Sequence, residues 1–226
     1  MLFRSRYVDI YKALDDIARE RKLTPEERAE QKKYTRLADA FTPLAKGMNS
    51  EYANQNAYDA IQIHGGSGFI MEYKCQRLYR DARIFSIYEG TTQLQVVAAI
   101  RYVTNGTYLG IIKEMLEKEV APEFQALKER VAKMVEKYED AINYVKAAGN
   151  NDLHDFLARR LYEMTAEIIM SLLILDDATR APELFAKSAN VYVRYAEGTV
   201  AGHYAYIKEF KAEDLADFLA AAPEEG

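Results

Sequence analysis

The sequence has a single cysteine and no long apolar run, and both shortages narrow the class of protein. Cys75 alone cannot form an internal disulfide, which fits a reducing compartment. The longest apolar stretch, residues 168–175, is far below the roughly 20 residues that a membrane-spanning helix needs. Residues 1–6 contain neither an apolar run nor a small-residue cleavage site, unlike a secretory signal peptide. We therefore expect a cytoplasmic protein without membrane insertion.

Basic residues are not in excess, and histidines are few. The formal net charge is -5, and lysines and arginines are interspersed with acids, so we expect no binding to nucleic acid. Carboxylate metal sites in helical bundles need a Glu three residues before a His. None of the histidines, His64, His154 and His203, has a Glu in that position. We therefore expect no metal site.

The alternation of apolar and polar residues that is typical of strands is also missing, and helical spacing takes its place. Apolar residues recur at three- and four-residue steps in the first segment, which predicts an amphipathic helix over residues 3–17. Thr24, Pro25 and Glu27 then form the start signal of a second helix, with a capping box. Pro43 disfavours helical geometry at Thr42, so we expect a break or kink there and a separate helix over residues 43–63.

The second half of the chain predicts longer amphipathic helices, over residues 110–120, 122–148, 152–179 and 182–211, with a short helix over 212–221. At 226 residues and 49% hydrophobic content, the chain is long enough for one large or two small domains. We predict an all-α protein: residues 1–109 form a four-helix-bundle-like domain, and residues 110–226 form a second helical bundle.

Residues 62–93 are the least regular part of the sequence. The glycine run over residues 65–68 follows a predicted helix rather than a strand, so it is not a dinucleotide-binding fingerprint. Alone, it fits a helix stop followed by a flexible loop as well as it fits a binding site. Glu89 is an isolated carboxylate among apolar and aromatic residues, so we expect partial desolvation, which favours proton abstraction. The alternative is that Glu89 interacts favourably with the N-terminus of the next helix. Spacing alone does not choose between the two.

Together, these motifs resemble the C-terminal part of the acyl-CoA dehydrogenase family. The family pattern is a Gln-x-x-Gly-Gly-x-Gly-aromatic run, then Arg-Asp-Ala-basic, then Ile-Tyr-Glu-Gly-Thr-x-x-aliphatic-Gln. It stands here as residues 62–69, 80–83 and 87–95, with the same order and spacing. The core motifs place residues 1–109 in the family's third domain. By helical pattern and placement alone, residues 110–226 resemble the additional helical C-terminal domain of one subgroup.

The resemblance implies a role for each matching residue. Glu89 would be the base that removes the α-proton of a fatty acyl-CoA thioester, while the β-hydrogen leaves as hydride to FAD and an enoyl-CoA forms. Tyr88 and Gly90 would contact the substrate. The residues that would contact FAD are Gln62, Gly65 and Gly66, which in the family often reach the FAD of a neighbouring subunit, together with Thr91 and Gln93. We interpret Arg80 and Asp81 as structural residues that brace the turn presenting Glu89.

The family also implies partners and a larger protein. The expected cofactor is FAD, the substrate an acyl-CoA of fatty acid β-oxidation, the assembly a homodimer or homotetramer, and the acceptor electron-transfer flavoprotein. Family members carry an N-terminal helical domain and a middle β-domain before this region, and residues 1–61 resemble neither. We therefore expect a C-terminal fragment that is inactive alone. The alternative, from another class, is a non-catalytic helical oligomerisation or interaction module.

Overall fold

The computed structural model describes residues 2–218, and no strand occurs in this part of the chain. The predicted all-α class is confirmed. The chain divides into two compact units, Met1–Ala99 and Ile100–Gly226, each with its own internal packing.

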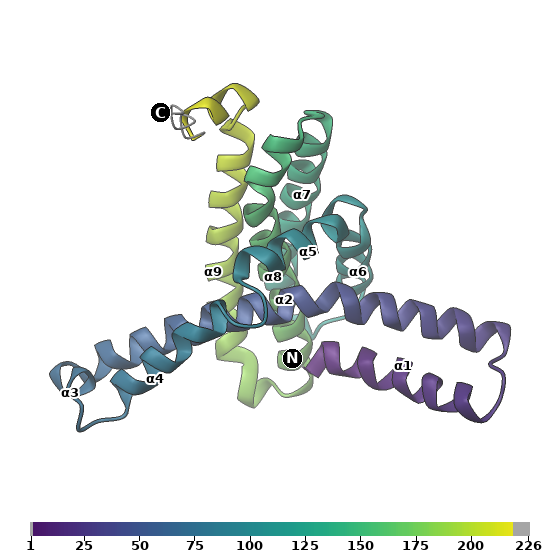
Figure 1. Cartoon of the computed structure of the whole chain (residues 1–226), viewed down its shortest axis with the longest axis horizontal. Helices are drawn as coiled ribbons and strands as arrows, with labels where there is room; N and C mark the ends of the chain where they lie inside the picture. Colours follow the sequence, from purple (N-terminus) through teal and green to yellow (C-terminus); the bar gives the residue numbers. More distant parts are fainter. Residues whose placement is uncertain (1, 219–226) are drawn as a thin grey trace, which may run out of the picture. The chain divides into compact units, whose positions relative to one another are not determined.

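Unit 1 is built along α2 (Pro25–His64), its longest helix. Figure 1 shows α1 (Leu2–Glu20) beside the first half of α2, and α4 (Cys75–Ala82) beside the second half. α3 (Gly66–Phe69) turns the chain at the end of α2, and η1 (Arg83–Ser86) continues α4 and packs on α2. α5 (Thr92–Thr104) follows and continues into unit 2.

The capping box at the start of α2 is confirmed. The Thr24 hydroxyl accepts a hydrogen bond from the backbone N–H of Glu27 at 3.2 Å, and the Glu27 carboxylate accepts one from the backbone N–H of Thr24 at 2.9 Å. Arg21 adds two hydrogen bonds to the same carboxylate, at 2.6 and 2.8 Å. The two capping-box contacts satisfy N–H groups that the start of a helix leaves without intrahelical partners, and Arg21 holds the Glu27 carboxylate in place.

The predicted break at Thr42 is wrong, because α2 runs through Pro43 without interruption and no separate helix begins there. A proline inside a helix costs about 3 kcal/mol. Phe41 and Leu44 flank the proline and are both buried, and burying such a side chain is worth about 1.5–3 kcal/mol. The Thr42 hydroxyl also donates to the Ala38 carbonyl at 2.8 Å, within the same turn. Packing therefore outweighs the local preference that the sequence signals.

Unit 2 contains the longer helices that the sequence predicts, with ends shifted by a few residues: α6 (Thr107–Leu116), η2 (Pro122–Phe124), α7 (Gln125–Ala147), α8 (Asn151–Arg180), α9 (Pro182–Glu209) and η3 (Ala212–Asp217). The last segment is a 3-10 helix, and residues 219–221 of the predicted short helix lie outside the described residues. α7, α8 and α9 pack against one another, and α6 packs on α7 and α8.

The core of unit 2 contains polar groups that are paired. Tyr138 is fully buried and its hydroxyl lies 2.6 Å from that of Thr165, which donates onward to the Leu161 carbonyl at 2.7 Å. Burial raises the pKa of Tyr138 above its ordinary value, so the phenol stays neutral. The Tyr192 hydroxyl likewise donates to the buried Glu167 carboxylate at 2.6 Å. Within residues 2–218, no helix is both long and apolar enough to cross a membrane.

Candidate active site

Glu89 lies on a tight turn between η1 and α5, within the Glu89 loop (residues 87–91). Its φ is 54°, which makes it the one non-glycine residue with a positive φ in residues 2–218. Gly90 follows with φ 92°, so two consecutive residues adopt the left-handed region. A non-glycine residue there costs about 1–2 kcal/mol, and such strain is concentrated at functional sites. The backbone conformation therefore indicates a functional role for Glu89 independently of its side chain.

α2 holds this loop through Lys46. The Lys46 ammonium donates to the Phe85 carbonyl at 2.8 Å and also to the Gly90 carbonyl. The Gln95 amide reaches the same Gly90 carbonyl at 3.4 Å. The two carbonyls that Lys46 binds come before and after Glu89 in the chain, so one side chain connects both ends of the turn.

A second contact fixes the start of α5. The Thr92 hydroxyl donates to the Glu51 carboxylate at 2.5 Å, and Thr92 is buried. Glu51 lies five residues after Lys46 on α2, so the same stretch of helix holds the loop and the helix that follows it. Neither Lys46 nor Glu51 was predicted from the sequence.

A cleft of about 580 Å³ opens beside the loop. Its walls come from α1, α2 and the segment from η1 to Glu89, and the lining residues are Arg4, Thr42, Ala45, Lys46, Asn49, Ser50, Ala53, Phe85, Tyr88 and Glu89. Glu89 is the one acidic residue in this lining, and Arg4 and Lys46 are the basic ones. Such a cleft has the size of a small-molecule site and presents a single group able to accept a proton.

The partial desolvation expected for Glu89 is not supplied by this chain. The side chains of Phe85, Ile87 and Tyr88 are exposed to 53%, 48% and 67%, so they face solvent instead of enclosing the carboxylate, and Glu89 is exposed as well. The prediction assumed that apolar neighbours in the sequence become apolar neighbours in space. In a short turn, consecutive side chains point in different directions, and this assumption fails.

Gln62, Gly65 and Gly66 lie at the other end of α2. Gly65 has φ 58° and its N–H donates to the Gln62 carbonyl at 3.2 Å, which ends the helix as predicted. All three residues are exposed. Gln62 lies sixteen positions after Lys46, which corresponds to about 24 Å of continuous helix. The structure thus separates this predicted group from the Glu89 loop.

Thr91 and Gln93 lie at the start of α5 and next to the loop. The Thr91 hydroxyl accepts a hydrogen bond from the backbone N–H of Leu94 at 3.3 Å, as a capping residue does. Both Thr91 and Gln93 are exposed. Of the predicted site residues, the structure therefore brings together Tyr88, Glu89, Gly90, Thr91 and Gln93.

Arg80 and Asp81 do not brace the loop, contrary to the interpretation from the sequence. Both side chains are exposed, and neither makes a hydrogen bond or ion pair with any residue in 2–218. Local support comes instead from Arg83, which donates to the Ser86 hydroxyl, and from Lys46 and Glu51 on α2.

Comparison with known proteins matches both parts of the chain to one family. Residues 18–103 match the model described as "Acyl-CoA dehydrogenase, C-terminal domain", and residues 104–215 match "Acyl-CoA dehydrogenase C terminal". A solved structure of an acyl-CoA dehydrogenase family protein from Porphyromonas gingivalis is 38% identical, over 50% of this chain and 98% of that one, with a TM-score of 0.48. The chain belongs to the acyl-CoA dehydrogenase family and corresponds to its C-terminal domains.

Two further relatives complete the comparison. The caffeyl-CoA reductase-Etf complex subunit CarC of Acetobacterium woodii is 56% identical over 52 residues, 23% of this chain and 14% of that protein. An acyl-CoA dehydrogenase complexed with FAD from Bacillus anthracis shares the fold, with a TM-score of 0.65 over 94% of this chain and 40% of that one, at 18% identity. The chain spans only 14–17% of the first three curated relatives that it matches.

Proposed function

We propose that this chain is the C-terminal part of an FAD-dependent acyl-CoA dehydrogenase and that Glu89 is its catalytic base. The observation that carries the proposal is the position of Glu89, on a left-handed turn beside a cleft in whose lining it is the one acidic residue. The Glu89 carboxylate takes the α-proton of the acyl-CoA thioester. The β-hydrogen leaves with its electron pair, and a double bond forms between the two carbons.

The residues assigned to FAD are compatible with a large ligand. Gly65 and Gly66 are exposed, and a Cβ built on either meets nothing within 4 Å, so the space beside this backbone is open. Thr91 and Gln93 are exposed at the start of α5, where helix N–H groups favour phosphate. Gln62, Gly65 and Gly66 would hold one part of FAD, and Thr91 and Gln93 another. When bound, FAD supplies the hydride acceptor.

The distance along α2 between the Glu89 loop and the group formed by Gln62, Gly65 and Gly66 supports a proposal for the oligomeric state. Because about 24 Å of helix lies between Lys46 and Gln62, the two groups fit contacts with the FAD of two different subunits. This favours a homodimer or homotetramer. Tyr88 and Gly90, on either side of the base, would contact the acyl-CoA, and the Gly90 backbone at φ 92° leaves no place for a larger residue without strain.

Exposed apolar residues support the proposal that the site is completed by other parts of the enzyme. Large apolar side chains that are at least 45% exposed are frequent around the loop and the α3–α4 corner: Ile63, Phe69, Ile70, Met71, Tyr73, Leu78, Ile84, Phe85, Ile87, Tyr88, Leu94 and Val97. Surfaces of this kind mark interfaces. Covering them would desolvate Glu89, so we propose that the chain alone is inactive.

The remaining assignments follow from the family. The name of the CarC relative includes an Etf complex, which supports electron-transfer flavoprotein as the acceptor here. We further propose a cytoplasmic enzyme of fatty acid β-oxidation. In it, residues 1–109 would be the acyl-CoA dehydrogenase C-terminal helical domain that carries Glu89, and residues 110–226 the additional C-terminal helical domain.

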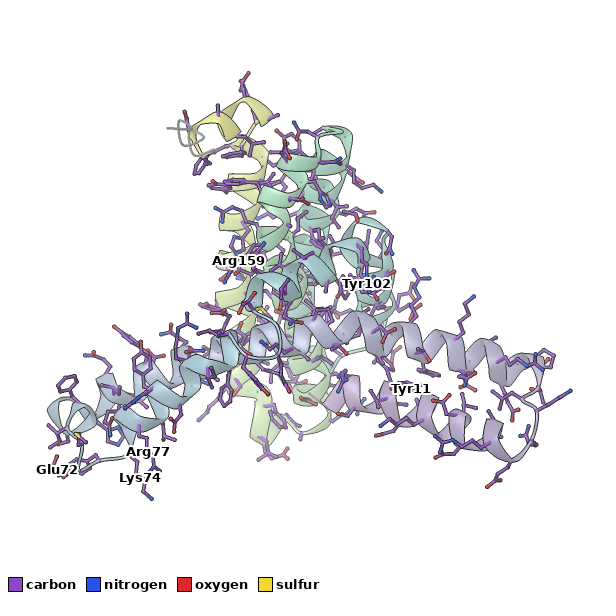
Figure 2. The ribbon with its side chains drawn as sticks, viewed as in Figure 1. Tyr11, Glu72, Lys74, Arg77, Tyr102 and Arg159 are labelled. Carbon is purple, nitrogen blue, oxygen red and sulfur yellow. The ribbon has the colours of Figure 1, made fainter. Side chains whose placement is uncertain are left out.

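Substitution of Glu89 tests the proposal in the complete flavoprotein. Glu89→Gln keeps the size of the side chain and removes the base, so acyl-CoA-dependent bleaching of the flavin should slow by about 10²–10⁴-fold while FAD stays bound. The control is Glu30→Gln, at an exposed residue in the first half of α2. Glu72, labelled in Figure 2, is less suitable because it lies between the exposed Met71 and Tyr73 of the proposed interface. Unchanged bleaching in Glu89→Gln would instead favour a non-catalytic helical module.

A further inference from the structure

We propose that Lys46 is a positioning residue for the proposed base: its ammonium fixes the turn that aims the Glu89 carboxylate into the cleft. This inference rests on the proposed function of Glu89. It concerns a residue forty-four positions before Gly90 in the chain, on a different element from the base.

The Glu89 loop supplies little support of its own. The N–H groups of Ile87 and Tyr88 both donate to the Ile84 carbonyl, at 2.9 and 2.8 Å. The N–H groups of residues 89–91 donate no hydrogen bond to any part of the chain that the structure describes. Two consecutive residues in the left-handed region add conformational cost. A strained conformation persists only where the surroundings impose it, so contacts from outside the loop must hold it.

Lys46 provides these contacts from a rigid helix. It donates to the carbonyls of Phe85 and Gly90, one on each side of Glu89. Its own backbone lies in the continuous α2, between the buried residues Leu44 and Gly47, and its carbonyl accepts a hydrogen bond from the Ser50 hydroxyl at 2.7 Å. Lys46 makes no ion pair with any described residue, so its charge is directed to the two carbonyls. Hydrogen bonds to a charged donor are stronger than neutral ones.

The consequence is geometric. An ammonium that binds the carbonyls before and after the base limits the rotation of the intervening peptide groups. A displaced base loses the alignment that proton transfer requires, and an error of about 1 Å can lower a rate by about 100-fold. The Lys46 ammonium also lines the cleft, but the two carbonyls already engage it, so we expect other groups of the cleft to set most of the substrate affinity. Loss of Lys46 should therefore affect turnover more than binding.

The test compares three substitutions in the complete flavoprotein. Lys46→Met keeps the length of the side chain and removes the donors, Lys46→Arg keeps donors, and Lys33→Met is the control on the exposed surface of the same helix. We expect Lys46→Met to lower kcat by about 10- to 100-fold with KM and FAD content unchanged. Lys46→Arg should recover at least part of the loss, and Lys33→Met should behave as the parent. Equal loss of FAD content and kcat, or no loss of kcat, would overturn the inference.

A second measurement separates this inference from the proposed function. In the chain itself, amide hydrogen exchange at Ile87 and Tyr88 should accelerate in Lys46→Met and not in Lys33→Met. If the parent flavoprotein shows no acyl-CoA-dependent bleaching, the proposed function fails, and the exchange result alone decides whether Lys46 holds the loop. Unchanged exchange at both amides would contradict the inference whatever the activity.

Discussion

Gly68 shows at the scale of one residue why a glycine can be required without any unusual backbone angle. It is buried at the corner after α2, where an added Cβ would lie 2.7 Å from the Ile61 carbonyl oxygen and 2.9 Å from the His64 Cβ. The nearest atom belongs to the backbone of a helix and cannot move aside easily. The third glycine of the run is therefore a packing residue, whereas Gly65 and Gly66 border open space.

The difference in packing between Gly68 and Gly66 predicts that replacement by alanine destabilises the chain more at Gly68. Gly68→Ala should lower the free energy of unfolding of the chain by about 1–3 kcal/mol, because overpacking forces the corner to shift. Gly66→Ala should change it by no more than about 0.5 kcal/mol, because the added methyl meets nothing within 4 Å. Urea titrations followed by circular dichroism measure both values. Equal losses in the two variants would mean that contact with Ile61 does not set the cost.

At the scale of the element, the start of α2 depends on one carboxylate. Hydrogen bonds from the Arg21 side chain and then from the Thr24 backbone lower the pKa of Glu27 from 4.5 to about 2. Because the pKa is lower in the folded chain, the contribution of Glu27 to stability is fully present above the unfolded value. It is lost as the pH falls through the folded value.

The pH dependence of stability tests this contact. Comparing the chain with Glu27→Gln, we expect the parent to be more stable above pH 4.5, and the difference to shrink as the pH falls toward about 2. The matched control is Glu26→Gln, in the same first turn but outside the capping box. Chemical denaturation at a series of pH values gives the comparison. A difference between parent and Glu27→Gln that stays constant from pH 6 to about 2 would contradict the predicted linkage.

The same helix shows what the sequence predicts well and what it does not. The capping box needs only residues three positions apart, and the pattern predicts it correctly. The continuation through Pro43 depends on burial of Phe41 and Leu44, which becomes known only once their packing partners are placed. Local signals thus predict where α2 begins and its end at Gly65, whereas tertiary packing decides that it continues through Pro43.

The candidate site likewise has features that the sequence predicts and features that it does not. The motif around Glu89 stands out because its residues are adjacent in the chain and match a family pattern. Lys46 and Glu51 contact this region from 44 and 41 residues away in sequence, and no local pattern signals such contacts. The exposure of Glu89 could not be predicted from the sequence either, because it depends on the directions in which the side chains of the turn point.

At the scale of the whole molecule, each unit has its own core, and the division falls inside α5. In unit 2, the largest fully buried side chains include Tyr138, Leu161 and Met164, in the packed helices α7 and α8. The helices that pack against one another here, α6 to α9, all follow α5 in the chain. A fragment that keeps α5 whole, residues 92–226, should therefore fold alone.

The fragment gives a direct test. We expect residues 92–226 to unfold in one cooperative transition, and Leu161→Ala to lower its free energy of unfolding by about 2–5 kcal/mol. Leu184→Ala, the same change at a side chain that is 69% exposed, should alter it by no more than about 0.5 kcal/mol. Thermal and urea unfolding measure both effects. A broad, non-cooperative transition of the fragment would show that unit 2 needs the preceding residues.

The unbroken α2 fixes the interval between Lys46 and Gln62 by a count of residues. Inserting or deleting one residue between them would turn one end by about 100° relative to the other and shift it by about 1.5 Å. Exchanging one side chain for another would leave this interval unchanged. Over evolutionary time, the exposed positions among residues 47–61 can therefore change in composition, but the segment cannot change in length, and insertions belong in the exposed connection over residues 70–74.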